Sequence, residues 1–153
     1  MIKDIRITEV PPQKAMAVRE AVANDQIQSK MGEFFGEVMS YMVRNGIQPT
    51  GPPFAFYHSY DQNITDMEVG FPCDETKVGE GRVMATTVPG GKIVTATHIG
   101  PYDKLIDSYN EMLRWMSERS LRPKKEMWER YLTDPASMED PEKYVTEMFW
   151  PYE

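Results

Sequence analysis

The stretch that decides the fold is GKIVTATHIGPYDKLIDSYNEMLRWMSER, residues 91–119. It opens on a β-branched run, turns at Gly100-Pro101, and continues with apolar residues at helical spacing. The apolar positions are Leu105, Ile106, Tyr109, Met112, Leu113 and Met116. This pattern predicts a strand that leads through a Gly-Pro turn into an amphipathic helix, and Pro123 is expected to prevent the helix from continuing past it.

The same apolar stripe occurs 74 positions earlier in the chain. Its members are Met31, Phe34, Phe35, Val38, Met39 and Met42. Ser29 is the expected N-cap of this helix, and Asn45-Gly46 is its expected stop. The same offset carries Pro49 onto Pro123 and Tyr57 onto Tyr131, and after a slip of five positions MEVGFP (67–72) matches TEMFWP (146–151). We infer an internal duplication.

Segments with strand composition surround both helices. In the first half they are residues 5–20, with a Pro-Pro interruption, 54–60 and 66–72. In the second half they are residues 81–91 and 92–100, expected to form a hairpin around Pro89-Gly90-Gly91, followed by 125–132 and 143–150. Each half therefore has the pattern β-α-β-β.

This pattern predicts an α+β fold made of a duplicated β-α-β-β unit with pseudo-two-fold symmetry. We expect a mostly antiparallel sheet, with the two helices on one face and a ligand cleft on the other. Residues 1–153 are expected to form a single domain, whose repeat halves span roughly 1–75 and 81–153.

Composition excludes several classes of function. The formal net charge of −7 argues against a nucleic-acid binder, because phosphate contacts need clustered Lys and Arg. The single cysteine, Cys73, excludes an internal disulfide framework, and its acidic neighbours argue against a reactive thiolate. Two histidines argue against a His-based metal site, so neither a metal nor a cofactor is predicted. No apolar run approaches 18 residues, so we expect no membrane span and a cytoplasmic protein.

Glu129 is the main candidate for chemistry. By strand alternation it shares a face with Tyr131, while Trp128, Arg130 and Leu132 take the other face. A carboxylate beside a tyrosine, on the face away from the helices, can hold a cation, or can act as a general acid or base when desolvated. The alternative is an exposed strand glutamate paired with Lys or Arg. Trp128 either fills the core or forms the edge of a cavity.

Four further aromatic positions and both histidines are placed by the repeat, by strand alternation or by the Gly-Pro turn. Tyr57, the repeat partner of Tyr131, is expected to form a paired clamp with it, although strands favour half-buried tyrosines in any case. Tyr102 opens the second helix, where its ring can reach the rim of a cleft. His98 is expected to support the Gly100-Pro101-Tyr102 turn rather than act in catalysis. The residues expected to pack on a helix are Phe54, Phe56 and His58.

The last strand offers two faces. Met148 and Trp150 suit the core that faces the helix, which leaves Glu147 and Phe149 as candidates for the cleft. Because Glu147 has a repeat partner in Glu68, a structural role in both halves is the alternative.

The second half resembles a known family. Its motifs are the run 91–119, WERYLTDP (128–135) and YVTEMFWP (144–151), with a looser match in ITEVPPQKAMAVRE (7–20) and FAFYHSY (54–60). Together they resemble the gyrase-inhibitory-protein-like (GyrI-like) small-molecule-binding domain, which also serves as the effector-binding domain of AraC-type and MerR-type multidrug regulators. The resemblance covers essentially the whole chain and implies a duplicated β-α-β-β fold.

The family implies three functions on one fold. The first is a stand-alone protein that binds lipophilic, often cationic, small molecules, in which the family's Glu-x-Tyr motif falls on Glu129 and Tyr131. The second is hydrolysis of reactive cyclopropane-containing compounds, with Glu129 as general base and Tyr131 orienting. The third is a protein that modulates gyrase or acts with a transcription regulator. The expected ligand-binding residues are Glu129, Tyr131, Tyr57, Phe149, Glu147, Tyr102 and Trp128.

Overall fold

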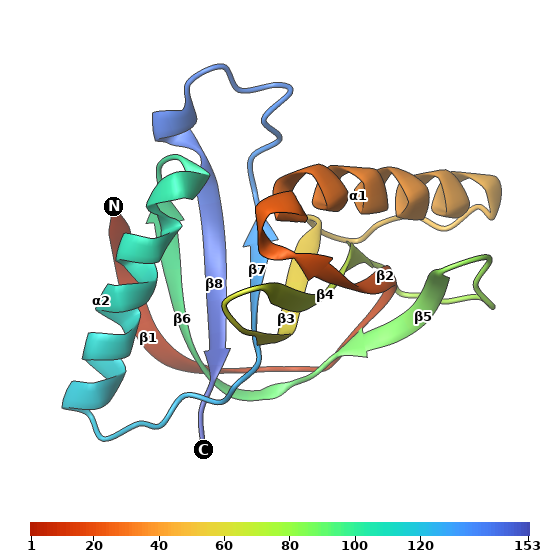
Figure 1. Cartoon of the computed structure of the whole chain (residues 1–153). Helices are drawn as coiled ribbons and strands as arrows, with labels where there is room; N and C mark the ends of the chain where they lie inside the picture. Colours follow the sequence, from red (N-terminus) through yellow and green to blue (C-terminus); the bar gives the residue numbers. More distant parts are fainter. The chain divides into compact units, whose positions relative to one another are not determined.

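The computed structural model describes residues 1–153 and has eight strands and two long helices (Figure 1). One compact unit is formed by residues 11–90. It contains β2 (Gln13–Ala23), α1 (Ile27–Arg44), β3 (Phe54–Tyr60), β4 (Ile64–Pro72) and β5 (Val83–Val88). The second unit is formed by residues 1–10 and 91–153. It contains β1 (Ile2–Val10), β6 (Gly91–Ile99), α2 (Leu105–Glu118), β7 (Met127–Tyr131) and β8 (Val145–Pro151).

The strands pair in the same order in both units. The order is β3-β4-β2-β5 in the unit of residues 11–90, and β7-β8-β6-β1 in the other unit. Each of these pairings is antiparallel. In each unit, one helix packs on one face of the strands: α1 on β2 and β4, and α2 on β6 and β1. The fold is therefore α+β and largely antiparallel, as the sequence predicts.

The predicted hairpin at residues 89–91 is wrong. β5 pairs with β2, and β6, which comes directly after β5 in the chain, pairs with β1 and β8. The segment expected to be one strand over residues 5–20 is likewise two strands, which the Pro-Pro step separates. Proline cannot donate to a ladder, so Pro11-Pro12 ends one pairing and the chain begins another.

The strand registers agree with the duplication. On β7 and β8, Trp128 pairs with Phe149 and Tyr131 with Thr146. The corresponding residues of β3 and β4, at offsets of 74 and 79, pair in the same way: Phe54 with Gly70, and Tyr57 with Met67. The slip of five positions read from the sequence is therefore the longer connection that precedes β8.

Both helices end in the same motif. The N–H of Ile47 donates to the carbonyl of Met42 at 2.9 Å, and the N–H of Leu121 donates to the carbonyl of Met116 at 2.9 Å. The residue before each donor has a left-handed backbone, with φ of 67° at Gly46 and 58° at Ser120. These are Schellman ends, and the predicted stop at Asn45-Gly46 is confirmed.

The predicted N-cap at Ser29 is wrong. α1 begins at Ile27, after a 3-10 turn over Asn24–Gln26, so that Ser29 lies inside its first turn. Neither helix has a side-chain N-cap bond. The buried face of α1 consists of Phe34, Val38, Tyr41 and Met42, and that of α2 of Ser108, Met112 and Met116. No helix in this chain combines the length and the apolarity that crossing a membrane requires.

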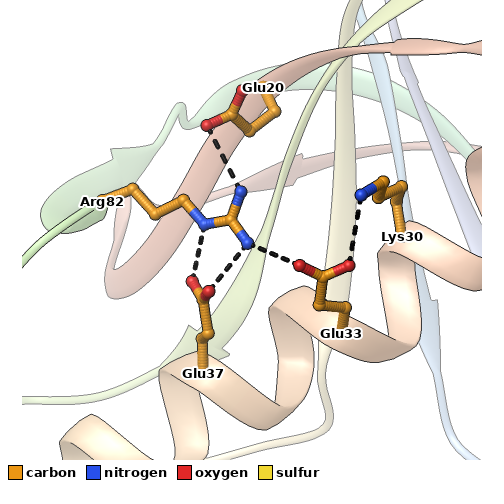
Figure 2. Close-up of polar contacts among 5 residues, drawn as sticks. All are labelled: Glu20, Lys30, Glu33, Glu37 and Arg82. Atoms are coloured by element: carbon orange, nitrogen blue, oxygen red, sulfur yellow. Dashed lines mark hydrogen bonds and ion pairs between the residues drawn. The ribbon is translucent and has the colours of Figure 1, made fainter.

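Arg82 fastens the start of β5 to α1 (Figure 2). Its Nε and Nη2 donate to the two carboxylate oxygens of Glu37 at 2.8 and 2.7 Å, and Nη2 also donates to Glu33 at 2.9 Å. Nη1 lies 3.6 Å from a carboxylate oxygen of Glu20 on β2, and the guanidinium stands 4.6 Å from the ring centroid of Phe34. The fork geometry of arginine suits such a bidentate contact.

Candidate functional site

Glu129 is a buried carboxylate held by two phenols. It lies in the middle of β7 and is 4% exposed. The hydroxyl of Tyr131, two residues further on the same strand, donates to Oε1 at 2.6 Å. The hydroxyl of Tyr109, from the middle of α2, donates to Oε2. A carboxylate that accepts from donors at both oxygens suits the ionised form, which has only acceptors.

The prediction that Glu129 points away from the helices is wrong. Glu129 pairs with Met148, and directly paired residues of antiparallel strands point to the same face. The hydrogen bond from Tyr109 on α2 identifies this face as the one that the helix covers. Tyr131 lies on the same face, because its strand partner Thr146 also pairs with His98, which bonds to α2.

The reason for this error is that β7 is buried on both faces. Its first three residues, Met127, Trp128 and Glu129, are all buried. In a strand without alternation of polar and apolar residues, the sequence tells which side chains share a face but not which face the helix covers. The expected helix-facing placement of Met148 and Trp150 is confirmed, since the ring of Trp150 meets that of Tyr109 on α2 at 5.8 Å.

Tyrosine rings extend the cluster from Glu129 toward the end of β7. The rings of Tyr102 and Tyr131 meet edge to face at 5.7 Å, and the ring of Tyr144 stands 5.2 Å from that of Tyr102. Burial, followed by the nearby Tyr144, Glu129 and Asp134, raises the pKa of the Tyr102 phenol above its ordinary value. The hydroxyl of Tyr102 therefore keeps its proton at neutral pH. The structure brings together Glu129, Tyr131 and Tyr102, as expected.

Three of the expected site residues lie on the opposite face of the same strands. The rings of Trp128 and Phe149 stack at 5.4 Å with an interplanar angle of 9°. The guanidinium of Arg130 lies 4.6 Å from the centroid of Phe149, and its Nη2 is 2.8 Å from a carboxylate oxygen of Glu147. Phe149, Glu147 and Trp128 thus form a second cluster, apart from Glu129, in which Glu147 makes an ion pair.

The unit of residues 11–90 carries an apolar version of the Glu129 cluster. At the repeat offset of 74, Glu129 corresponds to Ala55 and Tyr109 to Phe35, and the strand registers agree, since Ala55 pairs with Val69 as Glu129 pairs with Met148. Tyr57 is half-buried on β3 and pairs with Met67. The paired clamp of Tyr57 with Tyr131 stays a prediction.

The expectation that the aromatic face of β3 packs on a helix is wrong. The ring of Phe71 meets that of Phe35 on α1 at 5.7 Å, so Phe71 marks the face of β4 that the helix covers. Glu68 lies on the other face of β4; it pairs with Phe56 and its carboxylate is 2.8 Å from His58 Nε2. The residues on the face away from α1 are therefore Phe54, Phe56 and His58.

His98 positions the turn that carries Tyr102. It is fully buried on β6, with Nδ1 2.7 Å from the hydroxyl of Ser108 and Nε2 3.1 Å from the carbonyl of Pro101. A neutral ring that donates from Nε2 and accepts at Nδ1 satisfies both contacts. Burial lowers the pKa of His98, which favours this neutral form. The predicted supporting role of His98 is confirmed.

Tyr109 and Tyr144 belong to the cluster, but sequence reasoning missed both. Tyr109 reads as one more member of the apolar stripe of α2. The signal that could have found it is its repeat partner Phe35, because the duplication differs there by a single hydroxyl.

The sequence matches the family described as the GyrI-like small molecule binding domain over residues 3–153. A search of proteins with curated descriptions found no match.

Solved structures share the fold. The C-terminal domain of EcmrR superposes with a TM-score of 0.86 at 21% identity, over 98% of this chain and 97% of that one. This chain spans 57% of the EcmrR chain in its complex with DNA. A hydrolase encoded by lin2189 from Listeria innocua gives a TM-score of 0.66 at 17% identity, over 97% and 91%. SAV2435 bound to tetraphenylphosphonium gives 0.66 at 13% identity, over 99% and 94%. At these identities the likeness establishes the fold alone.

Proposed function

Because this chain belongs to the GyrI-like small-molecule-binding domain family, we propose that it binds lipophilic organic cations at Glu129. The observation that carries the proposal is a carboxylate 4% exposed, oriented by two phenols and continued by further tyrosine rings. Neither phenol brings positive charge. Aromatic rings attract cations through their quadrupole, and a desolvated carboxylate adds a full negative charge to that attraction.

The duplication supports a dedicated role for this carboxylate. The corresponding pair in the other unit, Ala55 and Phe35, shows that the same strand and helix positions accept small or apolar residues. Packing alone therefore does not call for Glu129 and Tyr109, and burying a carboxylate costs free energy that its binding role would explain. The solved complex of SAV2435 with tetraphenylphosphonium, a lipophilic cation, supports this class of ligand for the shared fold.

The test is titration calorimetry with tetraphenylphosphonium. Glu129→Gln keeps the shape of the side chain and removes its charge, so we expect affinity to fall at least about tenfold, which corresponds to about 1.4 kcal/mol. Glu147→Gln is the matched control: it removes a carboxylate from the neighbouring strand, on the opposite face, and should leave affinity within about twofold. Equal binding by the wild type and Glu129→Gln would exclude Glu129 as the cation site.

A hydrolase is the second candidate, favoured by the hydrogen bonds of Glu129 and by the fold shared with the Listeria innocua hydrolase. Glu129 would take a proton from water as the water oxygen bonds to a carbon of a strained cyclopropane. The ring C–C bond breaks, its electron pair moves to the carbon that bears an electron-withdrawing group, and that carbon takes the proton from Glu129, which returns to the carboxylate form. Tyr131 would orient the water.

This candidate is tested by incubating the protein with an activated cyclopropane and following the ring-opened product. Product formation that Glu129→Gln abolishes and Tyr131→Phe slows would support the enzyme. Saturable binding of the same compound, with no product above the rate in buffer, would leave the protein as a binder.

A further inference from the structure

Thr146 carries a buried hydroxyl that no protein group satisfies. Its side chain is fully buried on β8, and Oγ1 has no hydrogen-bond partner. Other buried threonines do have one: Thr95 Oγ1 donates to the carbonyl of Met148 at 2.9 Å, and Thr65 Oγ1 donates to Asn24 at 2.7 Å. Buried polar groups are nearly always paired, so an orphan hydroxyl calls for an explanation.

The side chain of Thr146 lies beside that of Tyr131, on the face of the strands that carries Glu129. Thr146 pairs with Tyr131 on one side and with His98 on the other, so all three side chains share the face that α2 covers. Both nitrogens of His98 are already engaged, with Ser108 and Pro101. The Tyr131 hydroxyl donates to Glu129. The neighbours of Thr146 therefore direct their polar groups elsewhere.

Packing does not explain the threonine. By the strand registers, the residue at the same place in the other unit is Met67, which is fully buried. An apolar side chain thus fits this position of the fold, and the hydroxyl of Thr146 is an addition on the same face as Glu129.

We propose that Thr146 is a second polar contact of the ligand site, selecting cations that also carry a neutral hydrogen-bond acceptor such as an ether oxygen. This inference rests on the proposed function. Any N–H of the ligand goes to the stronger acceptor, the carboxylate of Glu129, which leaves the threonine hydroxyl to donate. Because Thr146 is fully buried, this contact requires its partly exposed strand partner Tyr131, the last residue of β7, to move aside.

The experiment compares two matched probes, (2-methoxyethyl)triphenylphosphonium and butyltriphenylphosphonium, which differ by an ether oxygen in place of a methylene. Thr146→Val keeps the shape of the side chain and removes the hydroxyl. It should weaken the methoxyethyl probe about 5- to 10-fold, the worth of one hydrogen bond, and change the butyl probe less than about twofold.

Glu129→Gln, measured with the same probes, distinguishes the cation site at Glu129 from the hydrogen-bonding role of Thr146. If it weakens both probes while Thr146→Val treats them alike, the role of Thr146 is refuted and the cation site stands. If Glu129→Gln changes neither, the cation site itself is refuted, and the inference on Thr146 falls with it.

A measurement without ligand checks the premise. Thr146→Val should keep or raise Tm, because it removes an unpaired buried hydroxyl, whereas Thr95→Val should lower Tm, because it leaves the carbonyl of Met148 without its side-chain donor. A loss of Tm in Thr146→Val as large as that in Thr95→Val would show that the hydroxyl is already satisfied, and would overturn the inference.

Discussion

Exchanging the residues at the two helix ends should move stability in opposite directions. Gly46 and Ser120 occupy the same place in the two Schellman motifs, with φ of 67° and 58°. A residue with a Cβ is disfavoured in this left-handed region, where glycine is not. Ser120→Gly should therefore stabilise the protein, and Gly46→Ser should destabilise it.

The magnitude depends on two opposing effects. Relief of left-handed strain at Ser120 favours glycine by about 1–2 kcal/mol, and the extra freedom of glycine in the unfolded chain opposes it by about 0.5–1 kcal/mol. With the low values taken together and the high values taken together, the net gain is about 0.5–1 kcal/mol. A Cβ placed at Gly46 would meet no atom within 4 Å, so the cost of Gly46→Ser is the backbone cost alone.

Differential scanning calorimetry measures both effects. At about 2–4 °C per kcal/mol for a chain of this size, Ser120→Gly should raise Tm by about 1–4 °C, and Gly46→Ser should lower it by a similar amount. The double variant should return close to the wild type, because the two sites belong to different units. A fall in Tm for Ser120→Gly, or shifts of the same sign in both single variants, would refute the reasoning.

Four further predictions concern polar and buried groups. Arg82→Met should lower Tm, and less so in 1 M NaCl, which screens exposed charges. Because Arg82 lowers the pKa of Glu37, the stability that this pair contributes is present above the ordinary glutamate pKa and is lost as pH falls through the lowered pKa. The free energies of unfolding of the wild type and the variant should therefore converge at acid pH. Ser108→Ala leaves Nδ1 of buried His98 without its partner and should cost about 1–3 kcal/mol in urea unfolding. Because burial lowers the pKa of His98, the unfolded chain binds more protons below about pH 6.5, and wild-type stability should fall there, an effect that His98→Gln removes. Cys73 is fully buried and burial raises the pKa of its thiol, so iodoacetamide at pH 8 should modify it only after unfolding; rapid modification of the native protein would contradict its placement.

Periodicity predicted the elements better than their partners. The stripe of Met112 and Met116 identifies α2 because helix spacing is a local property. The hairpin expected at Pro89-Gly90 failed because a turn sequence permits local pairing, whereas β5 and β6 find their partners in β2 and β1, far along the chain. Strand pairing is set by tertiary burial, which a local pattern does not contain.

The sequence predicts the two central residues of the site, but not the face on which they lie or the helix residue that contacts them. Glu129 and Tyr131 are identified by alternation on one short strand and by the family resemblance. Their assignment to the face away from the helices failed because β7 is buried on both sides, and Tyr109 was missed because a tyrosine in a helical stripe reads as core. Comparing the two repeats residue by residue, where Phe35 lacks the hydroxyl and Ala55 lacks the carboxylate, would have found the asymmetry.

The pairing of β1 with β6 affects the order in which the strands can pair during synthesis. Val10 pairs with Gly91, so a ribosome that adds about 5–20 residues per second finishes β1 about 4–16 s before its partner strand begins. The strands of residues 13–88 pair among themselves and can close during that interval. During that interval the backbone N–H and C=O groups of β1 have no partner strand, which makes β1 the segment of the nascent chain most prone to pair with a wrong strand.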